Sequence, residues 1–72
     1  MNNIQDKIKE SINHRLGLAN VILNQNLQAV FNGDEIVLKG ETHFAQNSQL
    51  AEKMIKEISG SHAVVNRTQI KP

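Results

Sequence analysis

The chain has 72 residues, which is enough for one small domain over residues 1–72, because a chain this short buries only about 60% of its unfolded surface. It has no cysteine, which excludes disulfides, thiolate nucleophiles and cysteine-ligated zinc. Eight basic and seven acidic residues give a net charge of +1, which excludes the strong one-sign field that recruits nucleic acid.

The first predicted element is an amphipathic helix over residues 3–16. Its apolar side chains recur at every fourth position and form one narrow stripe: Ile4, Ile8, Ile12 and Leu16. Asn3 is the expected N-terminal cap, and His14 and Arg15 are expected at the carbonyl end, where positive charge is favoured. We expect Gly17 to end the helix in a left-handed conformation.

Residues 18–26 have apolar side chains without a clean period, so an extra helical turn and an added strand both remain open. Strand-like runs follow at residues 27–31 and 35–39, around Asn32-Gly33-Asp34, and Asn-Gly is a strong hairpin signal. We expect one face of this ribbon to carry Leu27, Ala29 and Phe31, another to carry Ile36 and Leu38, and both to be buried.

A second amphipathic helix is predicted from about Phe44 to Ser59, with Gly60 ending it. Its expected buried side carries Leu50, Ala51, Met54, Ile55 and Ile58. Residues 63–70 are rich in β-branched side chains and predict a final strand, which Pro72 stops.

This order of elements predicts an α+β two-layer sandwich of the order α-β-β-α-β. The last strand follows a helix and can therefore run parallel to one of the first two, which makes a small three-stranded mixed sheet. Both helices must bury an apolar stripe, and we expect them on one face of the sheet. The outer face then carries Val30, Val37 and Val65.

The residues from Ile36 onward follow the pattern of a known family. They are Ile36, Leu38 and Gly40, then Leu50, Ala51, Met54 and Ile58, then Gly60, Val64, Asn66 and Ile70. Over about residues 27–70 the chain resembles the BON domain, a small bacterial α/β module. It departs from the family pattern where aliphatic side chains are usual, at Thr42, Ser61 and Thr68, and in the differently built segment 18–26.

The motif residues have structural interpretations of their own. We expect Gly40 to serve a strand end or the close approach of a helix, and Gly60 to stop a helix, because glycine takes unusual backbone angles cheaply. Asn66 is expected to form hydrogen bonds with a turn or a helix terminus.

No catalytic constellation, metal site or cofactor site is predicted. His14, His43 and His62 lack the spacing of metal ligands, and Asp34 and Glu35 are adjacent strand residues that point to opposite faces. The serines have no nucleophile-elbow context. The chain also lacks a Gly-x-x-Gly loop and has only two aromatic residues, so we expect no nucleic-acid partner.

The resemblance implies a non-enzymatic binding module of the bacterial cell envelope, in the periplasm, that interacts with phospholipid surfaces or envelope proteins. A weakly basic surface for it can come from Lys39, Lys53, Lys56, Arg67 and Lys71, although Glu52 and Glu57 offset the helix lysines. A solvated face of mixed charge is the simpler interpretation. The alternatives are an oligomerising scaffold domain of a ring-building assembly, and a regulatory small-ligand or ion-sensing module.

The sequence itself gives one further expectation about location. No run approaches the roughly 20 apolar residues of a spanning helix. The segment Met1 to Asp6 lacks the basic and apolar regions of a signal peptide. We therefore expect a cytoplasmic protein if Met1 is the native start, and an excised domain otherwise.

Overall fold

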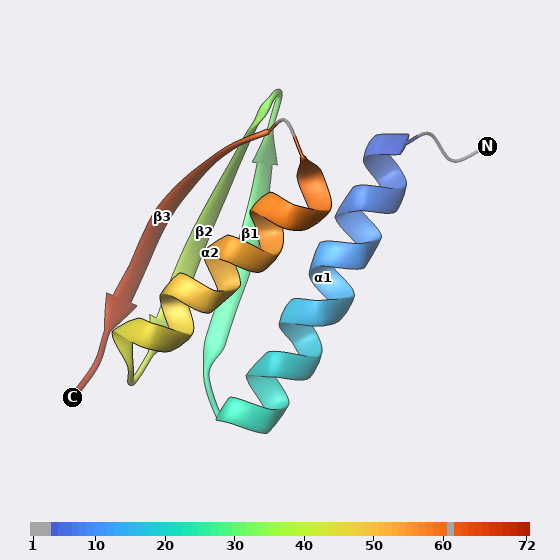
Figure 1. Cartoon of the computed structure of the whole chain (residues 1–72). Helices are drawn as coiled ribbons and strands as arrows, with labels where there is room; N and C mark the ends of the chain where they lie inside the picture. Colours follow the sequence, from blue (N-terminus) through green and yellow to red (C-terminus); the bar gives the residue numbers. More distant parts are fainter. Residues whose placement is uncertain (1–3, 61) are drawn as a thin grey trace.

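The fold is a sheet covered by two helices, as predicted. The computed structural model describes residues 4–60 and 62–72. Its elements, in chain order, are α1 (Ile4–Leu23), β1 (Asn26–Asn32), β2 (Glu35–Thr42), α2 (Ala45–Ser59) and β3 (Ala63–Ile70) (Figure 1). The predicted cap Asn3 lies outside the described residues.

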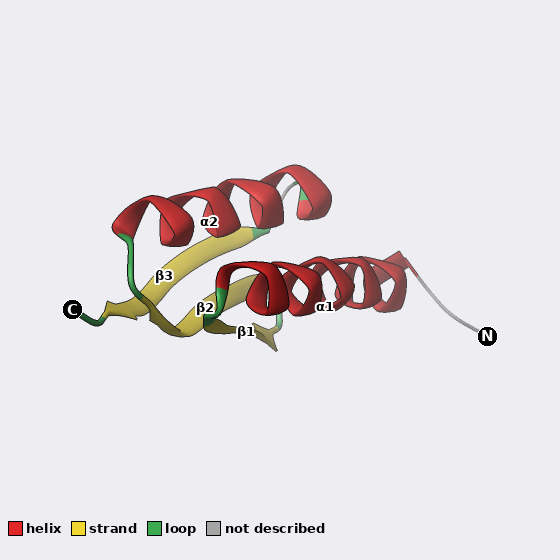
Figure 2. Ribbon diagram, turned by 90° about the horizontal axis from the view of Figure 1, so that it is seen from below, coloured by secondary structure: helices red, strands yellow, loops and turns green. Residues whose placement is uncertain are grey.

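The sheet has the strand order β1-β2-β3 and is mixed, because β2 pairs antiparallel with β1 and parallel with β3. Figure 2 shows α1 and α2 together on one side of it, which leaves the other side uncovered. The two-layer α+β architecture and the three-stranded mixed sheet predicted from the sequence are therefore confirmed.

The core lies between the helices and the sheet. Its buried apolar side chains come from every element except β3: Ile12, Leu16, Leu27, Ile36, Leu38, Ala51 and Ile55. Ala29 pairs with Leu38 across β1 and β2, and directly paired residues point to the same side of a sheet. The two apolar sets of the hairpin therefore share a single helix-covered face, and the prediction of a separate face for each was wrong.

The first helix continues beyond its predicted end. Gly17 lies inside α1, so His14 and Arg15 are mid-helix residues and not residues of the carbonyl end. Asn24 takes the left-handed conformation instead, with a φ of 51°. The Asn20 side chain holds this last part of α1 against β1, because it donates to the carbonyl oxygen of Leu27 and accepts from its N–H, both at 3.0 Å.

The hairpin occurs where the sequence predicts it, but its loop begins one residue later than the Asn-Gly signal. Asn32 still pairs with Glu35, and the two loop residues are Gly33 and Asp34. Gly33 has a φ of 61°, which glycine adopts without the steric cost of a side chain.

Gly40 serves neither a strand end nor a helix. Strand β2 continues to Thr42, and the backbone next to Gly40 belongs to β1: a Cβ at position 40 would lie 1.9 Å from the carbonyl oxygen of Asn26. Gly40 also has a φ of 119°. It is therefore the residue that lets β1 begin directly beside β2.

The second helix ends as predicted, and its predicted buried side is found except for one residue. Gly60 has a φ of 73°, and its N–H donates to the carbonyl oxygen of Lys56 at 2.9 Å. Leu50 is 57% exposed, contrary to the prediction. The other predicted positions are confirmed, because Ala51 and Ile55 are buried and Met54 and Ile58 pack against the core. The helix also buries Ser48 and Ser59.

Candidate functional site

Exposed apolar side chains are concentrated at one end of the molecule, which we call the apolar end. They come from the last turns of α1, the start of α2 and the end of β3: Leu18, Val21, Ile22, Leu23, Phe44, Leu50 and Ile70. In Figure 1 these segments lie at the end opposite the β1–β2 hairpin. Val30, on the uncovered side of the sheet, is the other large apolar residue exposed in the described part of the chain.

A hollow of about 340 Å³ runs between α1 and α2 beside the apolar end, and we call it the helix groove. Its floor contains the buried residues Leu16 and Ala51. Its walls are aliphatic or thioether side chains, and its polar members are few: Arg15, Gln25 and Asn47. An exposed apolar hollow of this kind is typical of a binding surface.

The sequence analysis missed the apolar end because it stopped the first helix at Gly17. The signal was available, since Leu18, Val21 and Ile22 are spaced as i, i+3 and i+4. Continued past Gly17, that spacing places them on one side of a longer helix.

Charges of both signs occur along the whole molecule. The hairpin end carries the acidic residues Asp6, Asp34, Glu35 and Glu57 together with the basic residues Lys7, Lys9 and Lys56. Near the apolar end, Arg15 lines the helix groove and Lys71 follows Ile70. Glu10, Glu52 and Lys53 lie near the middle of their helices.

The carboxylate of Glu41, near the apolar end, is paired with the Lys71 ammonium at 3.1 Å. Both residues line a polar hollow of about 240 Å³ with Asn24, Gln25, Asn26, Thr42 and His43. His43 can donate from Nδ1 to the carbonyl oxygen of Lys71 at 3.3 Å. This end therefore combines apolar side chains with cations, and its own acidic side chain is partly neutralised.

The structure does not bring the five predicted basic residues into one patch. Lys39 and Arg67 are paired neighbours on the uncovered side of the sheet. Lys53 and Lys56 lie on α2, in the other layer, and the Lys56 ammonium is 2.9 Å from the Glu52 carboxylate. Any lipid or partner role of these five residues stays a prediction.

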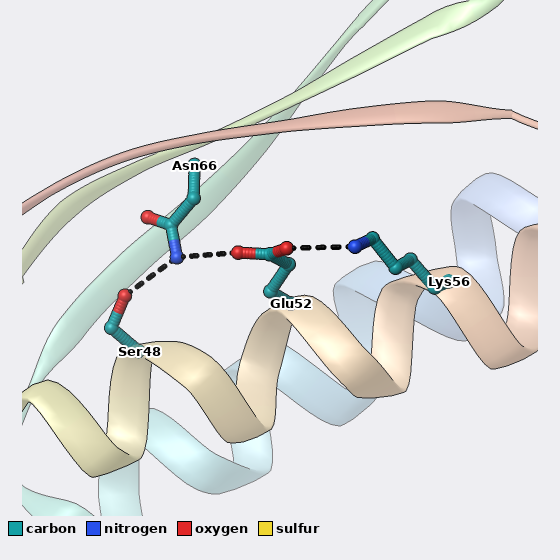
Figure 3. A network of polar contacts seen from close by, with 4 residues as sticks. All are labelled: Ser48, Glu52, Lys56 and Asn66. Atoms are coloured by element: carbon teal, nitrogen blue, oxygen red, sulfur yellow. Dashed lines mark hydrogen bonds and ion pairs between the residues drawn. The ribbon is translucent and has the colours of Figure 1, made fainter.

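Asn66 connects β3 to α2 through a network of polar side chains (Figure 3). Its side-chain amide donates to the Ser48 hydroxyl at 2.8 Å and to the Glu52 carboxylate at 3.0 Å. Its carbonyl oxygen accepts from the N–H and the hydroxyl of Thr68, at 3.0 and 2.7 Å. The partners are side chains of α2 and a strand neighbour, so the expected bond to a turn or helix terminus was wrong.

This network also shifts the pKa of one of its members, Glu52. The pKa of Glu52 is lowered from its ordinary value of 4.5, first because Lys56 donates to the carboxylate and then because Asn66 does. Glu52 thus acts as an anionic acceptor that holds Asn66 and Lys56 on one side of α2. These contacts hold α2 against β3, so the network has a structural role.

Two of the three residues that depart from the family pattern, Thr42 and Thr68, form hydrogen bonds with polar side chains. The buried hydroxyl of Thr42 donates to the side-chain oxygen of Gln25 at 2.8 Å, and Thr68 shares a hydrogen bond with the Ser48 hydroxyl. Buried polar groups need such partners to avoid a desolvation cost. Ser61, the third departure, lies outside the described residues.

Chemistry-bearing side chains do not converge elsewhere in the described structure. His14 lies within α1, His43 follows β2 and His62 precedes β3. Among residues 4–60 and 62–72, no group of three or more His, Asp and Glu side chains is placed to hold a metal ion. Neither helix of the described chain is both long and apolar enough to span a bilayer.

Comparison with known proteins agrees with this architecture. The family model of the BON domain matches residues 2–72, which is nearly the whole chain. A search of curated proteins finds no match.

Proposed function

Because the chain belongs to the BON domain family, we propose that it is a non-catalytic module that docks its apolar end onto an anionic phospholipid surface of the bacterial envelope. The family is one of binding domains without catalytic activity, and it is associated with the envelope. The anionic phospholipid surface and the residues that dock onto it are our proposal for this chain.

The observation that carries this proposal is the clustering of exposed apolar side chains at one end. Val21 is 83% exposed and Ile22 78% exposed, and both lie on the last turns of α1. Moving such a side chain from water into the acyl boundary of a bilayer contributes about 1.5–3 kcal/mol. A helix end of this kind lies in the interface and does not cross it.

One cation beside the apolar end supports the same orientation. Arg15, which lines the helix groove, would reach the lipid headgroups, where a basic residue near an anionic surface contributes about 1 kcal/mol. Lys71 contributes less because Glu41 pairs with it. The hairpin end, with its charges of both signs, lies away from the bilayer in this orientation.

Vesicle sedimentation tests the proposal. We expect binding to phosphatidylglycerol-containing vesicles that weakens as salt is added, and little binding to purely zwitterionic vesicles. Val21→Asp combined with Ile22→Asp should reduce the affinity by about tenfold or more, because two apolar insertions are lost.

The matched control is Val30→Asp, which places the same charge on the uncovered side of the sheet. Its circular dichroism spectrum and vesicle binding should equal those of the wild type. Docking through the apolar end would be contradicted if the double variant bound vesicles as well as the wild type does. It would also be contradicted if only Val30→Asp lost vesicle binding.

A second candidate, assembly with a protein partner or with further copies of the chain, is favoured by one specific feature. Val37 pairs with Val30 on one side and with Val65 on the other, which makes an unbroken β-branched row across the uncovered sheet face. The predicted outward placement of these valines is confirmed. Sedimentation velocity over a concentration series, repeated with Val37→Lys, tests this candidate: self-association that the substitution abolishes would support it.

A further inference from the structure

We propose that the helix groove binds a single acyl chain of an anionic amphiphile and that Arg15 contacts its charged headgroup. The inference deepens the proposed function and rests on it for the lipid nature of the ligand. It concerns a defined small-molecule site, whereas docking of the apolar end concerns the bilayer surface.

The dimensions and lining of the helix groove fit one alkyl chain. Its volume of about 340 Å³ is near the lower end of the roughly 300 to 1,000 Å³ that small-molecule sites occupy. Leu16 and Ala51 close the floor, so the groove is a surface channel and not a passage into the core.

The walls are adaptable as well as apolar. Leu18 and Ile22 of α1 face Leu50 and Met54 of α2 across the groove. Methionine is unbranched and has a polarizable sulfur, so it fits irregular or flexible ligands. An alkyl chain needs such a lining because it offers no hydrogen-bonding group along its length.

Arg15 supplies the charge complementarity. It is the charged residue of the groove lining, and no carboxylate among residues 4–60 and 62–72 forms an ion pair with it. A guanidinium can donate two parallel hydrogen bonds to a carboxylate or a phosphate. The polar side chains of Gln25 and Asn47 also lie on the lining and can donate to a headgroup.

The groove can be separated from the apolar end by mutation. Val21 belongs to the apolar end but does not line the groove, whereas the half-buried Ala19 lines the groove and is not one of the exposed apolar residues. Val21→Asp should therefore weaken vesicle binding and leave the groove intact. Ala19→Phe should fill the groove and leave the vesicle-binding residues in place.

The test is calorimetric titration with laurate below its micelle-forming concentration. We expect one laurate to bind per chain, and Ala19→Phe to reduce that affinity by about tenfold or more through loss of the space that the chain occupies. Arg15→Gln should weaken laurate by a similar factor while leaving monomeric decyl maltoside, which has no charge, unchanged. Val21→Asp should bind laurate as the wild type does.

A measurement on the unmodified protein keeps the proposal testable if Ala19→Phe fails to fold. On laurate addition, the methyl resonances of Met54 and Leu50 should shift, and those of Val30 should not. No laurate binding by a wild-type protein that still binds vesicles would overturn the groove site and leave the proposed function standing. A dimer that Ala19→Phe dissociates would also overturn it, because a second copy would then occupy the groove.

Discussion

The carbonyl oxygen of Asn26 lies where a Cβ of residue 40 would have to be, at 1.9 Å from its ideal position. Only glycine can therefore occupy position 40 while β1 begins beside β2. Asn20, near the end of α1, is hydrogen-bonded to Leu27, the next residue of β1. The Asn20 hydrogen bonds hold the last turns of α1, which carry part of the apolar end, beside the start of β1.

Gly40→Ala is expected to destabilise the protein by about 3 kcal/mol or more, because it adds a backbone clash to a positive φ. Gly17→Ala is the matched control, since Gly17 lies inside α1 and a Cβ there would meet no atom within 4 Å. That control should stabilise the protein by about 0.5–1 kcal/mol. Urea unfolding followed by circular dichroism measures both, and equal midpoints would refute the role assigned to Gly40.

Asn24 provides a test of the longer first helix. Its φ of 51° is left-handed, so Asn24→Gly should retain or slightly raise the unfolding free energy, whereas Asn24→Ala should lower it by about 1 kcal/mol. The same urea titrations give both values. If α1 ended at Gly17, the unfolding free energies of the two variants would not differ in this order.

Asn66→Ala should lower the unfolding free energy by about 0.5–1.5 kcal/mol, because Ser48 and Thr68 each lose a hydrogen bond to Asn66 but keep the one that they share. Gln69→Ala is the control from the same strand, since residue 69 alternates to the uncovered side of the sheet. A loss of vesicle binding by a folded Asn66→Ala protein would count against a purely structural role.

Stability should also depend on the charge of Glu52. Its folded-state pKa lies below 4.5, so its contribution is complete above the unfolded value and is lost as the pH falls through the folded one. Glu52→Gln should therefore be less stable than the wild type at about pH 7, with a smaller difference at about pH 3. Urea midpoints at both pH values measure this.

Glu57→Gln is the reference variant, because Glu57 lies on the same helix without an ion pair in the described structure. Its midpoints should differ from those of the wild type by the same small amount at both pH values. A difference for Glu52→Gln that is undiminished in acid would mean that the carboxylate charge is not what stabilises the network.

Local patterns predicted the elements well where the sequence carries its own stop signals. The bounds of β3 were predicted as found, since β-branched residues fill it and Gly60 ends the preceding helix. Gly17 misled the prediction because a helix interior tolerates glycine when neighbouring contacts support it. Here that support comes from Asn20, whose two bonds to Leu27 depend on tertiary structure.

The candidate site was less predictable than the fold. Helix α2 faces both the sheet and α1, and periodicity cannot show which neighbour a given apolar residue meets. Leu50 was therefore assigned to the core although it lines the helix groove. The basic residues were grouped by charge alone, while the sheet separates Lys39 and Arg67 from the lysines of α2.

The orientation on the membrane can be measured directly because the chain has no cysteine of its own. Ile22→Cys and Asp34→Cys each allow one fluorophore to be attached, at the apolar end and at the hairpin end. With phosphatidylglycerol vesicles that contain quencher-labelled acyl chains, we predict quenching of the fluorophore at position 22 and none at position 34. Quenching at position 34, or at neither position while the protein sediments with vesicles, would contradict docking through the apolar end.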